Sequence, residues 1–137
     1  MPFAWGVSAL ALIFGAALGA RALIDPEWAA KFVRLKQDEQ GGGFAEFRAT
    51  YGGVFLFLHL VALVFTLFYL WGGEYVIGVC ATGASAAIAA GWGGAALGRV
   101  ISMWRDGADT KFNRMSAGVE TAMAFAIGMP WLVWFLS

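Results

Sequence analysis

Charged side chains stand at the ends of long apolar segments, where they could bind an anionic group. Arg48 precedes the apolar run 54–71, and Arg99 stands near the end of the following apolar run. A guanidinium offers planar N–H donors that match a phosphate or a carboxylate in bidentate geometry. Carboxylates at the same segment ends could hold these arginines: Glu46, Asp106 and Glu120. These residue types predict recognition of an anion at the edge of an apolar layer.

Two further candidate ligand-binding residues, Tyr51 and His59, follow Arg48 in the chain. A set of residues recurs at steps of three and four, which is one face of a helix, and we expect this face to point into the bundle: Arg48, Gly52, Phe55, His59, Ala62, Thr66 and Tyr69. His59 lies about 16 Å along such a helix from Arg48. The alternatives are structural: the charges pair and fix the helix ends, and His59 is a neutral histidine hydrogen-bonded to a neighbouring helix.

Residues for several other chemistries are missing from the sequence. It contains one histidine and one cysteine, so neither a bis-histidine haem site nor an internal disulfide can form within the chain. It has no Glu-x-x-His pair, phosphate-cradling loop, nucleophile elbow or nucleic-acid motif. We therefore predict no catalytic residue, cofactor, metal or nucleic acid, and we expect a non-catalytic protein rather than an enzyme.

The composition indicates a membrane protein. Of the 137 residues, 61% are hydrophobic and 13% charged, whereas soluble domains carry about 25% charged residues. Four segments reach the length of about 20 apolar residues that a spanning helix needs: 3–24, 44–71, 75–101 and 117–136. We predict an all-α, integral membrane four-helix bundle in a single domain, 1–137. No basic residue precedes the first segment, so we expect a retained span, not a cleaved signal peptide.

A short amphipathic helix is expected between the first two spans, over about residues 26–39. Asp25 can cap it and Pro26 suits its first turn. Its apolar residues recur at helical spacing: Trp28, Phe32 and Leu35. Such a helix lies on a membrane surface, and the glycines at 41–43 would end it. The alternative is an ordinary polar loop.

The basic residues predict the orientation. With four spans, all nine Lys and Arg fall on one side, and the other side holds both termini and the turn 72–74. Basic residues near span ends favour the cytoplasm. We expect a bacterial inner-membrane protein with both termini periplasmic. An aromatic belt marks the outer boundary: Trp5, Tyr69, Trp71, Tyr75, Trp131 and Trp134.

Small residues at four-residue spacing predict close helix packing, as is typical in lipid. Gly15 and Gly19 form such a ladder with Ala11, and the third span is small almost throughout. We therefore expect the third span to be the most enclosed. If its helix continues past 101, Gly107 is expected to end it. The same ladders could serve contacts in a homo-oligomer.

Three short motifs carry a resemblance to a known family. The stretches EFRATYGG at 46–53 and GRVISMWRDG at 98–107, followed by Glu120, resemble the small bacterial membrane family of domain of unknown function 4345. The likeness covers about residues 44–125. It implies a four-helix integral membrane protein without an established activity. The family-type positions are Glu46, Arg48, Tyr51, Gly52, Gly53, Gly98, Arg99, Asp106, Gly107 and Glu120.

The sequence leaves three functions open. The first is binding of a lipid-like or other amphiphilic anionic ligand at the Arg/Glu cluster on the cytoplasmic side. The second is a structural or accessory subunit of a larger membrane complex. The third is a small proton-linked transporter, which rests on His59 as the only ionisable group near mid-membrane. The expected partners are membrane lipids, with a homo-oligomer or a larger membrane complex as further possibilities.

Overall fold

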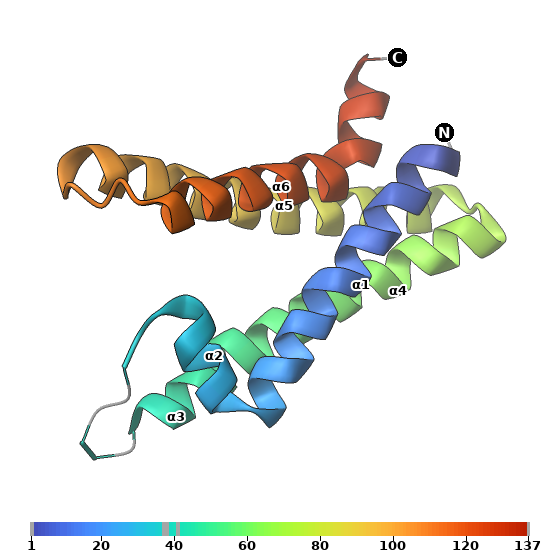
Figure 1. The fold of residues 1–137 in the computed structure, drawn as a ribbon. Helices are drawn as coiled ribbons and strands as arrows, with labels where there is room; N and C mark the ends of the chain where they lie inside the picture. Colours follow the sequence, from blue (N-terminus) through green and yellow to red (C-terminus); the bar gives the residue numbers. More distant parts are fainter. Residues whose placement is uncertain (1, 37–38, 41, 137) are drawn as a thin grey trace. The chain divides into compact units, whose positions relative to one another are not determined.

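The computed structural model describes residues 2–36, 39–40 and 42–136, and these form helices joined by short turns (Figure 1). The elements are α1 (Pro2–Ile24), α2 (Pro26–Val33), α3 (Gly42–Glu46), the π-helix η1 (Phe47–Val54), α4 (Phe55–Gly72), α5 (Tyr75–Arg105) and α6 (Lys111–Leu136). No strand occurs among the described residues. The predicted all-α fold with four long apolar helices is confirmed.

The chain forms two compact units, which are described separately. One unit contains residues 1–11 and 65–137, and the other contains residues 12–64. The helices α1 and α4 are each divided between the two units.

In the first unit, α5 and α6 pack side by side and run in opposite directions (Figure 1). Gly107, at φ +66°, ends α5, as the sequence predicts, because glycine adopts a left-handed conformation without steric cost. The hydroxyl of Thr110 accepts the Asn113 N–H at 3.2 Å, which caps the start of α6. The helix α6 therefore begins at Lys111, six residues before the predicted start at 117.

In the second unit, glycines bring the backbones of α1 and the α4 segment into direct contact. A Cβ added at Gly19 would lie 2.7 Å from Leu56 Cα, and one at Gly52 would lie 2.7 Å from Leu23 Cα. Real Cβ atoms essentially never approach so closely. The small residues predicted on the first span thus pack against the bulkier second one, as close helix approach in lipid requires.

The expectation that the third span is the most enclosed is wrong. Within the chain, α5 is the least buried of the four spans at 17%, and α1 is the most buried at 44%. Four α5 glycines would meet no neighbouring atom if a Cβ were added: Gly83, Gly91, Gly94 and Gly98. Small residues allow two helices to approach closely but do not by themselves bring the helices together. In α1 the glycines at 15 and 19 contact a neighbouring helix closely.

The short helix α2 begins as predicted but ends early. Asp25 accepts the Trp28 N–H at 2.9 Å, and Pro26 occupies the first turn. The helix stops at Val33, not near 39, because Arg34 adopts a left-handed conformation at φ 61°. The glycines at 42 and 43 begin α3 instead of ending α2, whereas Asp38 and Gly41 lie outside the described residues.

Contacts on one side hold α2 against the rest of its unit. Ala29 of α2 joins Ala22 and Phe47 in a small buried core. The Arg21 guanidinium lies 4.3 Å from the centre of the Trp28 ring, a cation–π contact. The predicted amphipathic character therefore serves packing within the chain as well as any contact with a membrane surface.

Replacing Asp25 with alanine is expected to loosen α2 without affecting the spans. The change removes the acceptor for the Trp28 N–H, and loss of such a cap costs about 1 kcal/mol. Amide exchange at residues 27–30 should become several-fold faster, whereas exchange in α5 should not change. Asp25→Asn keeps a capping oxygen and should behave like the unsubstituted chain. Equal exchange in Asp25→Ala would contradict the role of the cap.

Candidate functional site

Arg99 and Glu120 form an ion pair between α5 and α6. The Arg99 Nε donates to both Glu120 carboxylate oxygens, at 2.8 and 2.9 Å. The Glu120 side chain is 10% exposed and the Arg99 side chain 34% exposed. The structure thus brings together two of the predicted ligand-binding residues, at the end of the α5–α6 pair where the chain turns at 106–110.

Asn113 is a third member of this cluster that the sequence analysis missed. Its Oδ1 accepts from Arg99 Nη1 at 3.4 Å, and its Nδ2 donates to the Ala108 carbonyl at 2.7 Å. Asn113 therefore ties the turn at 106–110 to the arginine. A signal was present, because Asn113, Ala117 and Glu120 follow at steps of four and three and so share one face of α6.

Arg48 has different partners, in the other unit. Its Nη1 donates to the backbone carbonyls of Leu23 and Ile24 at the end of α1. The last carbonyls of a helix lack partners within the helix, and they carry the negative end of its dipole. Arg48 therefore caps the C-terminal end of α1. A shared cluster of Arg48 with Arg99 stays a prediction, because the two arginines belong to different units.

The π-helix η1 shifts the face on which Arg48 was expected. The buried positions here are Phe47 and Gly52, five residues apart, which matches the i→i+5 hydrogen bonding of a π-helix. Arg48 was predicted in the buried stripe, but it is exposed, and Phe47 takes the buried place. Beyond Gly52 three of the five remaining stripe members are buried, His59, Ala62 and Thr66, whereas Phe55 and Tyr69 are half-buried.

The remaining candidate ligand-binding residues are Glu46, Tyr51 and Asp106. Glu46 ends α3, and its carboxylate accepts from the Thr50 hydroxyl at 3.4 Å. The Tyr51 ring packs 5.6 Å from that of Phe47. Asp106 follows the last residue of α5 and is exposed, and its backbone N–H donates to the Ser102 carbonyl at 2.9 Å. Among the described residues its carboxylate forms no ion pair with Arg99.

His59 is enclosed, at 2% exposure. Its Nδ1 lies 2.7 Å from the Phe55 carbonyl, and this bond makes Nδ1 the protonated nitrogen. The ring lies against Gly15 so closely that any Cβ there would overlap it. These contacts give His59 a packing role between α1 and α4.

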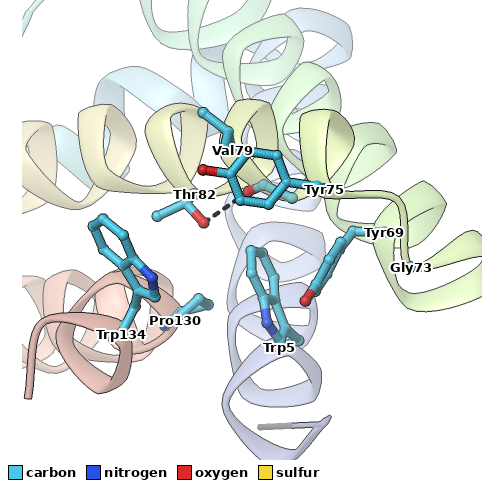
Figure 2. A pocket seen from close by; sticks show the side chains of 9 residues that line it. Trp5, Tyr69, Gly73, Tyr75, Val79, Thr82, Pro130 and Trp134 are labelled. Carbon is cyan, nitrogen blue, oxygen red and sulfur yellow. Dashed lines mark hydrogen bonds between the residues drawn. The ribbon is translucent and has the colours of Figure 1, made fainter. Parts of the chain in front are cut away.

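A pocket of about 290 Å³ lies near the turn that joins α4 to α5. Aromatic side chains from four helices line it, and Figure 2 shows how they converge: Trp5, Tyr69, Tyr75 and Trp134. The Trp5 and Tyr69 rings are 4.6 Å apart. The sequence analysis assigned these residues to an aromatic belt, and no periodicity within one helix could show that they share a cavity.

The length and apolar composition of the four long helices indicate an α-helical, multi-pass membrane protein. No protein-family model, curated protein or solved structure matches the chain. The resemblance to the family of domain of unknown function 4345 therefore stays a prediction. Among the described residues, no group of three or more His, Cys, Asp or Glu could hold a metal ion.

Proposed function

We propose that this membrane protein is non-catalytic and binds an amphiphilic ligand whose anionic head contacts Arg99. The observation that carries the proposal is how Arg99 uses its donors. Only its Nε donates to the Glu120 carboxylate. Its Nη1 donates to Asn113 Oδ1 over a long distance of 3.4 Å. Among the described residues, its Nη2 has no hydrogen-bond partner.

Glu120 fixes the position of the guanidinium, and this supports binding over simple pairing. A guanidinium that only bridged two helices would gain most by facing the carboxylate with two nitrogens. Here Nη2 is left for another acceptor, Nη1 beside it makes only the long bond to Asn113, and the side chain is 34% exposed. A phosphate or carboxylate oxygen fits that edge, and the apolar surface of α5 beside it suits an acyl tail.

The proposal is tested with Arg99→Lys. Lysine keeps the charge beside Glu120 but cannot offer the planar pair of terminal donors. Native mass spectrometry of gently extracted protein should show that retention of phosphatidylglycerol falls several-fold, while the thermal midpoint changes little. Arg114→Lys is the matched control, because Arg114 pairs with Asp109 in an exposed bridge at 3.0 Å. Unchanged retention of phosphatidylglycerol in Arg99→Lys would refute the proposal. The ion pair would then have only the structural role of joining α5 to α6.

The proposed setting is the bacterial inner membrane with both termini outside. The distribution of nine basic residues to one side supports this orientation. It places the Arg99 cluster on the cytoplasmic side, where anionic lipid attracts basic side chains.

A second candidate function is that of an accessory subunit or homo-oligomer, and one observation favours it. The outward glycines of α5 offer a close-packing surface that the chain itself does not cover. The same mass spectra would report a fixed partner or copy number. A monomer without a partner would count against this second function.

A further inference from the structure

We propose that the aromatic pocket near the α4–α5 turn binds a quaternary ammonium group. This site is separate from the Arg99 cluster: it is lined by residues at the start of α5, whereas Arg99 lies near the end of that helix. The occupant is defined by its chemistry, a compact cation with an apolar surface. Such cations are recognised by aromatic faces through cation–π attraction.

The ring content of the pocket supports a cation of this shape. Trp and Tyr are the aromatic residues with the strongest attraction for cations, and the four rings here are of these two types. Tyr75 and Trp134 are 83% and 65% exposed, so most of their surface is accessible to a ligand, whereas Trp5 is 6% exposed. The remaining lining is mostly small or apolar, with Thr82 already donating to the Gly78 carbonyl at 2.8 Å.

The charge around the pocket is complementary to a cation. Glu74 stands between Gly73 and Tyr75, both of which line the pocket. It is the only charged residue between Arg48 and Arg99, and the lining segments 2–11, 65–98 and 121–136 contain no Lys or Arg. Glu74 precedes α5, but its carboxylate makes no capping hydrogen bond there. Glu74 is exposed, and among the described residues its carboxylate forms no ion pair.

An anionic or a neutral ligand fits these features less well. An anion would meet Glu74 and the negative faces of the rings without any basic side chain to offset them. A neutral apolar group would gain from burial but would gain nothing from Glu74. Only a cation uses both the rings and the carboxylate.

The test compares choline with its neutral isostere, 3,3-dimethylbutan-1-ol, by saturation-transfer NMR on the full chain in maltoside micelles. Choline is expected to bind saturably, and the isostere about tenfold more weakly. Tyr75→Leu and Trp134→Leu should each weaken choline binding roughly fivefold, the effect of losing about one cation–π contact. Glu74→Gln should also weaken choline several-fold but leave the isostere unchanged.

Trp71→Leu is the control for these substitutions. Trp71 is 90% exposed and lies close to the turn, but it does not line the pocket. Its loss should leave choline binding unchanged. Equal binding of choline and the isostere, no saturable binding of choline, or full binding in both Tyr75→Leu and Trp134→Leu would overturn the proposal.

The cation could belong to a lipid headgroup or to a soluble molecule. Nanodiscs of phosphatidylcholine and of phosphatidylglycerol distinguish these sources. Phosphatidylcholine that is retained and then released by choline identifies a headgroup site, whereas choline binding without retained lipid identifies a soluble cation. Both results support the pocket. Neither depends on Arg99→Lys, so the two proposals can fail separately.

Discussion

Gly19→Ala should lower the midpoint of thermal unfolding of the protein substantially. The new Cβ would lie 2.5 Å from the Leu56 backbone nitrogen and 2.7 Å from its Cα. Backbone atoms cannot relieve the overlap by a change of rotamer, as a flexible side chain can. The helices α1 and α4 must therefore move apart. Overpacking costs about 1–3 kcal/mol, and we expect the upper end because contacts along the whole helix pair are lost. The measurement is thermal unfolding in a fixed detergent.

Gly94→Ala in α5 is the matched control for Gly19→Ala. A Cβ at Gly94 would meet no atom within 4 Å. Alanine is favoured over glycine inside a helix by about 1 kcal/mol, so this variant should be as stable as the unsubstituted chain or more stable. If both variants lost stability equally, the close approach of α1 and α4 would not be the cause.

Arg99→Met should produce the second large loss of stability. It leaves the Glu120 carboxylate, 10% exposed, without its two hydrogen bonds from Nε. Removing one member of a buried pair costs about 3–5 kcal/mol. We expect about 2–3 kcal/mol, because the Arg99 side chain is partly exposed and the pair is therefore not fully removed from water. Thermal unfolding in detergent measures the loss.

The double variant Arg99→Met with Glu120→Leu separates loss of the pair from loss of packing. Apolar side chains often replace a buried pair without loss, so the double variant should recover most of the stability lost in Arg99→Met. Arg114→Met is the exposed comparison: its pair with Asp109 has side chains 62% and 56% exposed, and such pairs contribute under about 1 kcal/mol. A double variant as unstable as Arg99→Met would show that the carboxylate is not what makes the single change costly.

If Arg99→Met is costly and Arg99→Lys is not, the positive charge beside Glu120 sustains the fold. The terminal guanidinium nitrogens, which lysine lacks, are then not required for stability. Stability and lipid retention therefore report on different atoms of one side chain. Measuring both in the same preparations keeps the structural and the binding roles of Arg99 apart.

The sequence by itself determined the helices and most of their ends. Apolar length set the four spans, Asp25 and Pro26 set the start of α2, and Gly107 set the end of α5. These features depend on neighbours within a few residues, and local chemistry is what a sequence displays directly. The stripe from Gly52 through His59 to Thr66 was also predictable, because a regular helix has a fixed period.

Tertiary structure decided the contacts that no local rule fixes. The π-helical turn moved Arg48 off the buried face and toward the end of α1, where its partners lie more than twenty residues away in the chain. Gly15 and Gly19 of α1 pack closely whereas Gly94 and Gly98 of α5 do not, although both pairs have the same four-residue spacing. Asn113 beside Arg99 and four aromatic rings around one pocket likewise depend on which helices meet. Periodicity shows which face a residue occupies, but only packing between helices determines what that face contacts.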